Sequence, residues 1–303
     1  MKLIIPGIAL VAAMMMQAQH AYNSTQLRIH NTADRHPHEI TGNVERTTKA
    51  INYGKRTSLT NVAVRGTTLS PGGRGEAKVA SKQGGIEIQA EFGGLPGATR
   101  FGPEYLTYVL WAITPEGRVA NLGEVVPNNT KSKFNVTIEF DVFGLIVTAE
   151  PYFAVSRPSD VVVMENVFSR DSVQRIEEVD AKYQLLPRGI YTANLSRELK
   201  LIVVDPDTPL DLYEARNALW IALWAGAEKD AAELFAKAER SLQKAEAFHE
   251  SGAGARQVLT AARETVQTAE NARAIALERR SENRFPAEGR RAWWNGRQYV
   301  DDE

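Results

Sequence analysis

The segment IEIQAEF at residues 86–92 decides the fold class, because apolar and polar side chains alternate in it with the period of a β-strand that has one face in water. The run YLTYVLWAI at residues 105–113 is apolar on both faces, so we expect it to form a central strand. Turn residues separate the strand-like segments and no helical pattern intervenes, which predicts an antiparallel, Ig-like β-sandwich over residues 57–170. The other strands are expected at residues 59–64, 118–123, 134–140, 144–149 and 161–167.

A helical pattern replaces the strand pattern after residue 209. Apolar and small side chains, many of them alanine, recur at spacings of three and four over residues 210–250 and again over residues 258–280. Gly226 is placed to bend or divide the first stretch, and the short connection SGAG at residues 251–254 forces neighbouring helices to run antiparallel. We therefore predict an alanine-rich helical hairpin over residues 209–280. A connector at residues 171–208, with room for another strand, joins it to the sandwich, and the fold class is α+β.

The first 21 residues have the composition of a secretory signal peptide. Lys2 is followed by an apolar run to Met16 that is shorter than the roughly 20 residues of a membrane span, and the small residues Ala18 and Ala21 suit cleavage. An uncleaved N-terminal anchor is the alternative. No later segment is apolar enough to span a bilayer, so we expect an exported protein, periplasmic or associated with the outer envelope. Residues 22–56 are polar and predict a flexible arm.

The composition excludes several functions. Lys and Arg number 36 against 37 Asp and Glu, so the net charge of −1 gives no overall attraction to nucleic acid. Because the chain has no cysteine, disulfides, thiolate metal sites, cysteine nucleophiles and lipid-anchored cysteines are excluded. His30, His36 and His38 fall in the polar arm, which does not supply the rigid surrounding contacts that a transition-metal site needs. We therefore expect no metal.

The common catalytic motifs are missing from the sequence. It contains no Gly-x-Ser-x-Gly elbow, no His-Glu-x-x-His pair and no Gly-x-Gly-x-x-Gly motif that opens a helix. We therefore predict a protein that is not an enzyme and carries no cofactor. A hydrolase that uses carboxylates near strand ends, such as Glu150 and Asp160, is a further alternative and would require a deep polar cleft.

Two groups of aromatic residues are candidate contacts for a partner or ligand. Trp220 and Trp224 lie one turn apart on the first predicted helix, where they either pack against the connector or dock on another surface. The tail at residues 281–303 combines arginine with tryptophan, a combination that binds polyanions, lipid headgroups or glycans. The alternative is that the tail folds back and buries its tryptophans. The candidate residues of the tail are Arg290, Arg291, Arg297, Trp293 and Trp294.

Five segments of the chain are distinctive: GGLPGATRFGP at 93–103, WAITPEGRVANLG at 111–123, FGLIVTAEP at 143–151, LYEARNA at 212–218 and ARETVQTAENAR at 262–273. They resemble segments of an uncharacterised family of bacterial envelope proteins. In that family a β-sandwich module precedes an alanine-rich helical-hairpin domain of unknown function, commonly upstream of a peptidoglycan-binding module of the outer-membrane-protein-A type. The last module is absent from this sequence, so the resemblance does not imply wall anchoring, and it implies no catalytic residue. The resemblance covers about residues 85–280.

Together these features predict an exported, non-enzymatic envelope protein that acts as a structural or interaction module. The sandwich would serve as a docking domain and the hairpin as a spacer. We expect the partner to be an envelope protein or a cell-wall or lipid component, and we expect no nucleic acid; the oligomeric state is left open. The alternative function is a periplasmic ligand-binding or sensory module that recognises glycan, peptidoglycan or lipid headgroups.

Overall fold

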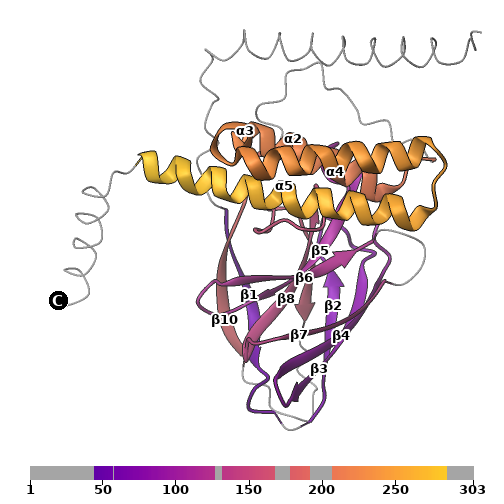
Figure 1. Cartoon of the computed structure of the whole chain (residues 1–303). Coiled ribbons are helices and arrows are strands. Elements are labelled where there is room, and N and C mark those ends of the chain that lie inside the picture. The colour runs from indigo at the N-terminus through magenta and orange to yellow at the C-terminus, as the bar shows by residue number, and fades with distance from the viewer. Residues whose placement is uncertain (1–43, 57, 127–131, 168–177, 192–206, 285–303) are drawn as a thin grey trace, which may run out of the picture. The chain divides into compact units, whose positions relative to one another are not determined.

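The helices form a layer that lies across one end of a module of strands (Figure 1). The computed structural model describes residues 44–56, 58–126, 132–167, 178–191 and 207–284, all within the unit Thr41–Glu303. The chain is therefore α+β, with its described strands before its helices. The strands are β1 (Val44–Asn52), β2 (Thr60–Gly66), β3 (Arg74–Lys82), β4 (Gly85–Gly93), β5 (Thr107–Ile113), β6 (Val119–Val125), β7 (Ser132–Ile138), β8 (Val142–Glu150), β9 (Val162–Val167) and β10 (Glu178–Leu185). The helices are α2 (Leu210–Trp224), α3 (Ala227–Asp230), α4 (Ala232–Glu250) and α5 (Ala255–Arg284), with a 3-10 turn η1 (Ala98–Phe101).

The ten strands belong to one antiparallel sheet that curls strongly (Figure 1), in which β8 pairs with three strands, and β5 lies between β8 and β6. Its order is β10-β1-β8-β9-β2-β3-β4-β7, and β6 joins through β5, which pairs with β8. The β5–β8 register runs from Thr107 opposite Glu150 to Ile113 opposite Gly144. The antiparallel arrangement and the central position predicted for residues 105–113 are therefore confirmed.

Two hydrophobic cores lie on opposite faces of β5. Leu110 and Ala112 point into a core enclosed by the strands, whereas Val109 and Trp111 belong to a second core that the sheet shares with the helices. A strand between two cores must carry apolar side chains on both faces, because successive side chains point in opposite directions. This explains the unbroken apolar run at residues 105–113, and it shows that the strands and helices share buried surface.

Three strands lie where the sequence pattern predicts none or leaves the matter open. β1 falls inside residues 22–56, for which we predict a flexible polar arm, and β3 is not predicted at all. β10 lies in the connector at residues 171–208, where the sequence analysis allows one more strand. β10 alternates in burial, with Ala181, Tyr183 and Leu185 inside, and it pairs with β1, which buries apolar side chains only near its end. β3 buries only Ala77 and Val79 along its central part. The few apolar side chains of β1 and β3 make these two strands hard to recognise from the sequence.

A left-handed glycine divides the first helical stretch. α2 ends at Trp224, and Gly226 has a φ of 85°, which glycine adopts without the strain that a side chain would cause. The prediction that Gly226 bends or divides this stretch is confirmed. α2, α3 and α4 all pack against α5. The helical region is therefore a layer of several helices, whereas the sequence pattern predicts a hairpin of two. The buried alanines of this layer include Ala218, Ala222, Ala238, Ala245, Ala262, Ala269, Ala272 and Ala276.

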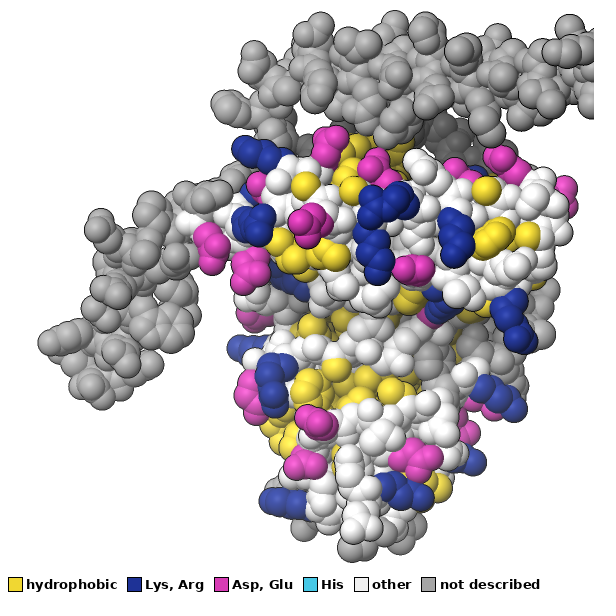
Figure 2. All heavy atoms as spheres, viewed as in Figure 1, with side chains coloured by type: hydrophobic (Ala, Val, Ile, Leu, Met, Phe, Trp, Pro, Cys, Tyr) yellow, Lys and Arg dark blue, Asp and Glu magenta, His cyan; other side chains and the backbone are white. Residues whose placement is uncertain are grey.

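Several predicted features lie outside the described residues. They are the signal peptide at residues 1–21, the arm up to residue 43 with His30, His36 and His38, and the tail from residue 285. Among the helices in the described ranges, none is both long and apolar enough to cross a membrane. Figure 2 shows basic and acidic side chains interspersed over the visible face, in keeping with a net charge of −1.

β1 crosses close over β8 at Gly144. The side-chain amide of Asn166 bridges the two strands there: its oxygen accepts a hydrogen bond from the Leu145 N–H at 2.6 Å, and its nitrogen donates to the Lys49 carbonyl at 3.0 Å. A Cβ atom at position 144 would lie only 2.4 Å from the same Lys49 carbonyl oxygen. The close approach of two backbones therefore requires glycine at this position.

Gly144→Ala is expected to lower the free energy of unfolding by about 3 kcal/mol, because the backbone of β1 would have to move away from β8. Urea denaturation followed by circular dichroism measures this change. Gly72→Ala is the matched control, since a Cβ there would come no nearer than 3.6 Å to the Gly94 carbonyl oxygen. We expect the control to change stability by no more than about 0.5 kcal/mol. Equal losses in the two variants would contradict the assigned role of Gly144.

Candidate functional site

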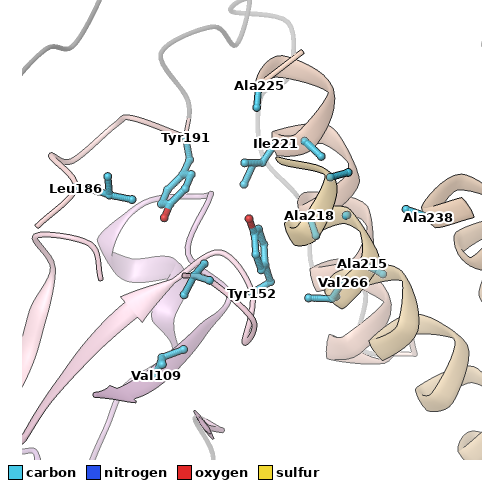
Figure 3. Close-up of a cluster of buried hydrophobic side chains, with 14 of the residues drawn as sticks. Val109, Tyr152, Leu186, Tyr191, Ala215, Ala218, Ile221, Ala225, Ala238 and Val266 are labelled. Carbon is cyan, nitrogen blue, oxygen red and sulfur yellow. The ribbon is translucent and has the colours of Figure 1, made fainter. Parts of the chain in front are cut away.

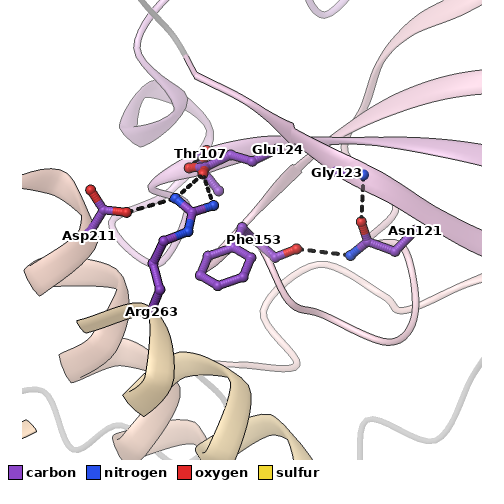
Figure 4. A network of polar contacts seen from close by, with 7 residues as sticks. All are labelled: Thr107, Asn121, Gly123, Glu124, Phe153, Asp211 and Arg263. Carbon is purple, nitrogen blue, oxygen red and sulfur yellow. Dashed lines mark hydrogen bonds and ion pairs between the residues drawn. The ribbon is translucent and has the colours of Figure 1, made fainter. Parts of the chain in front are cut away.

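Arg263 on α5 ties the helices to the sheet (Figure 4). Its guanidinium donates to Glu124 Oε2 on β6 at 2.9 and 3.1 Å and to Asp211 Oδ1 on α2 at 2.8 Å. The guanidinium also lies over the ring of Phe153, with Cζ 4.1 Å from the ring centroid. The Thr107 hydroxyl donates to the other oxygen of Glu124 at 2.8 Å. One arginine thus bridges α5, α2 and β6, and its charge is stabilised by two carboxylates and an aromatic face.

Glu214 completes a cluster of three carboxyl groups. It lies one turn after Asp211 on α2, and one carboxylate oxygen from each of Glu124, Asp211 and Glu214 falls within 4.8 Å of the others. Glu214 is fully buried, and neither of its oxygens has a hydrogen-bond partner among the described residues. Burial raises the pKa of Glu214 well above its usual range, and the negative charges of Glu124 and Asp211 raise it further. The cluster therefore needs a positive charge or a proton beyond what Arg263 supplies.

A second ion pair lies where α5 meets the loop after β8. Glu270 accepts hydrogen bonds from Arg273 Nε at 2.6 Å and from Arg273 Nη2 at 2.8 Å. It also accepts from the Tyr152 hydroxyl at 2.6 Å and from the Ser156 N–H at 3.0 Å, while Arg273 Nη2 donates to Ser156 Oγ at 3.1 Å. The Glu270 and Arg273 side chains are only 4% and 9% exposed. This pair is buried, and both oxygens of Glu270 accept hydrogen bonds, so it fixes α5 against the loop after β8.

A chain of hydrogen bonds runs through the core to Glu150, the last residue of β8. The Trp111 indole N–H donates to the Thr148 hydroxyl at 2.7 Å, and that hydroxyl donates to Glu150 Oε1, which also accepts from the Ser159 N–H at 2.7 Å. The other oxygen of Glu150 has no partner among the described residues. Burial raises the pKa of Glu150 to about 8, although the hydrogen bonds from Thr148 and Ser159 oppose the shift. A pKa near 8 keeps most of the Glu150 carboxyl protonated at pH 7.

Two tyrosines occupy the boundary between the sheet and the helices. Figure 3 shows Tyr152 and Tyr191 with their rings between the strand residue Val109 and the helix residue Ile221. The hydroxyl of Tyr152 is bonded to Glu270, whereas that of Tyr191 has no partner among the described residues. Burial raises the pKa of both hydroxyls well above the usual range, so both remain protonated.

The carboxylates that we considered for hydrolysis occupy different settings. Glu150 is fully buried and bonded within the core. Asp160 is partly exposed, and its Oδ1 lies 3.9 Å from Arg188 Nε. A hydrolase would require both groups to face one substrate. The enclosed position of Glu150 instead suits a role in holding the end of β8.

The tryptophan pair lies on α2 as predicted, partly exposed. The rings of Trp220 and Trp224 are 6.1 Å apart between centroids and inclined by 33°. Trp224 packs against the core shared by the sheet and the helices. The other predicted contact residues, Arg290, Arg291, Arg297, Trp293 and Trp294, lie outside the described residues.

No protein-family model matches the chain. No curated protein and no solved structure matches it either. What the carboxylate clusters and the tryptophan pair can do therefore follows from their own chemistry and geometry.

Sequence reasoning missed both arginine clusters, although a signal for each was present. Glu214 is in phase with the buried alanines Ala218 and Ala222, four and eight residues later on α2. Arg273 is in phase with Val266 and Ala269 on the buried face of α5. A charged side chain at a position where the helical period places apolar residues must find a buried partner. That rule would have selected Glu214 and Arg273, but it could not have named their partners.

Proposed function

We propose that this chain is an exported, non-enzymatic envelope protein that acts as a structural or interaction module. In this proposal the strands serve as a docking domain of the Ig-like sandwich type, and residues 209–280 serve as the alanine-lined helical hairpin that spaces it or pairs it with a partner. The signal-peptide pattern and the resemblance to the envelope family support export. The partner is an envelope protein or a cell-wall or lipid component.

The observation that carries the proposal is the two-sided apolar character of α2. One side of the helix is buried through small residues such as Ala215, Ala218 and Ala222. The other carries Trp220 and Trp224, which remain partly exposed. Tryptophan is enriched at the energetic centres of protein interfaces, because it combines a large apolar surface with an N–H donor. A helix with this pattern is suited to contact a second surface.

The ion pairs of Arg263, which are partly exposed, support the same proposal, because they link this helix to α5 and to the sheet. Asp211 at the start of α2 is bonded to Arg263 of α5, which is bonded in turn to Glu124 of the sheet. A surface that is already ordered loses less conformational freedom when it binds. The polar groups of these clusters thus contribute to rigidity in the proposed module.

The test compares two double variants of the full chain in the organism that encodes it. Trp220→Ala with Trp224→Ala removes the pair, and Leu259→Ala with Leu277→Ala removes two exposed apolar side chains of α5 as the control. After fractionation, we expect a processed chain in the envelope fraction that cross-links to a partner. We expect cross-linking to fall at least about fivefold in the tryptophan variant and to be unchanged in the control. Thermal melting verifies that both variants fold.

Two outcomes of this test would contradict the proposal. One is an intact chain in the cytoplasm that retains Met1, which would show that the protein is not exported. The other is unchanged cross-linking in the tryptophan variant, which would show that α2 does not contact the partner through Trp220 and Trp224.

The alternative function, recognition of glycan or lipid headgroups, is favoured by one sequence feature, the combination of arginine and tryptophan in residues 281–303. Pull-down on purified peptidoglycan and on anionic vesicles distinguishes it from the interaction module. Retention of the full chain, and loss of retention when residues 281–303 are removed, would favour ligand binding. Equal behaviour of the two forms would favour the module.

A further inference from the structure

The three-carboxylate cluster at the junction of α2 and β6 has an excess of negative charge. Glu124, Asp211 and Glu214 contribute three carboxyl groups, and Arg263 is the cation that acts on them within the described residues. With every group ionised the cluster would carry two uncompensated negative charges. Uncompensated charge away from water is costly, so a proton or a bound cation must accompany the folded state.

Glu214 provides an independent indication that something binds here. It is fully buried and directed toward Glu124 and Asp211, and neither of its oxygens receives a hydrogen bond from a described N–H or hydroxyl group; a hydrogen bond to the Glu124 carboxyl requires a proton between the two groups. Buried carboxylates in native proteins are normally satisfied by a donor, a water molecule or a metal ion. Among the described residues, the donors bonded to the cluster serve the other two carboxylates: Thr107 donates to Glu124, and Arg263 donates to Glu124 and Asp211.

We propose that Glu124, Asp211 and Glu214 bind a hard divalent cation of the Ca²⁺ type. The donor set consists only of carboxylate oxygens, which select Ca²⁺, Mg²⁺ or Mn²⁺ over the softer transition metals. The oxygens lie within 4.8 Å of one another. That span is close to twice the roughly 2.3–2.6 Å of a Ca²⁺–oxygen contact, so one ion can reach all three groups.

The bound ion would link α2 to β6, two elements that Arg263 also links. Asp211 and Glu214 come from the first turns of α2, and Glu124 comes from β6. A cation between them adds a second link between the helices and the sheet. Arg263 is 39% exposed, so its guanidinium can shift toward solvent as the ion enters. The proposal concerns cation binding alone and does not rest on the proposed interaction function.

The rival explanation is a proton shared between Glu214 and Glu124. Such a proton would also remove the excess charge, but it predicts no dependence on a divalent ion. The two explanations therefore differ in their response to Ca²⁺ at fixed pH.

The experiment titrates the full chain with Ca²⁺ at neutral pH after treatment with EDTA. Isothermal titration calorimetry should show one site per chain, and about 1 mM Ca²⁺ should raise the melting temperature by about 5 °C. NaCl at matched ionic strength serves as the control for screening. Absence of calorimetric binding, or an equal effect of NaCl, would overturn the proposal.

Variants locate the site. Glu214→Gln should abolish the Ca²⁺-dependent shift, and it should fold in EDTA because it removes a buried charge. Glu228→Gln, an exposed position on α3, is the matched control and should retain the shift. A shift that persists in Glu214→Gln would place the ion elsewhere and overturn the proposal.

Arg263→Gln should strengthen Ca²⁺ binding, whereas Glu214→Gln should abolish it. Without the competing guanidinium, Ca²⁺ should bind at least about threefold more tightly. The variant should melt at a lower temperature than the natural chain in EDTA and recover in Ca²⁺. Failure of Ca²⁺ to restore the melting temperature would favour the shared proton and overturn the proposal.

Discussion

Arg273→Ala should destabilise the folded protein by about 3–5 kcal/mol, because it leaves the Glu270 carboxylate charged and buried without its cation. The guanidinium makes two hydrogen bonds to Glu270 and one to Ser156. The remaining partners of Glu270, the Tyr152 hydroxyl and the Ser156 N–H, carry no positive charge. Guanidinium chloride denaturation followed by far-UV circular dichroism measures the loss.

Two further variants distinguish the cost of leaving Glu270 charged and buried from the cost of losing the contacts of the Arg273 side chain. Arg273→Met combined with Glu270→Gln removes both charges and keeps most of the volume, so it should recover much of the stability lost in Arg273→Ala. Lys237→Ala, whose ammonium lies 3.5 Å from Glu264 on the surface of α4 and α5, should cost less than about 1 kcal/mol. A loss below about 1 kcal/mol in Arg273→Ala itself would show that this pair does not anchor α5.

Stability should fall as the pH rises from about 5 to about 8, because of Glu150. Burial raises the pKa of this carboxyl from 4.5 to about 8 in the folded protein. Between these values the folded state keeps the proton and the unfolded state releases it. The contribution of Glu150 is therefore complete below the unfolded pKa and is lost as the pH rises through the folded pKa, at ~1.4 kcal/mol per pH unit.

Glu150→Gln isolates this effect, since glutamine is uncharged at every pH and its side-chain oxygen can still accept from Thr148 and Ser159. The free energy of unfolding of the natural chain and of the variant should differ by an amount that grows with pH above about pH 5 and levels off above about pH 8. Glu233→Gln, at an exposed position on α4, controls for the substitution. A difference that is independent of pH would contradict the buried, protonated state of Glu150.

The strands with strong patterns and the helical faces could be predicted from the sequence. Residues 86–92 alternate along β4, and residues 105–113 are apolar on both sides along β5. The alanine periodicity over residues 210–280 likewise marks the faces along which the helices pack. These patterns are local, because the period of a strand or helix is visible within a few residues. β1 and β3 have nine residues each but few apolar side chains, so a local pattern did not reveal them.

The candidate sites were harder to predict because their partners are distant in the chain. Arg263 meets Glu124 across 139 positions, and the Tyr152 hydroxyl meets Glu270 across 118. A single sequence shows which charged residues fall on an apolar face, as Glu214 and Arg273 do. It does not show which opposite charge will face them, since that depends on how the helical layer lies on the sheet.

The sequence by itself determined that a region of strands precedes a region of helices, and it determined the break at Gly226 and the alanine-lined faces, because each follows from neighbouring side chains and backbone preferences. The tertiary structure alone decided that β5 and β8 separate two cores and that β1 joins the sheet beside β8. It also brought Glu124, Asp211 and Glu214 together. These features arise from packing between distant segments, where burial turns an ordinary carboxylate into a group that requires a proton, an arginine or a cation.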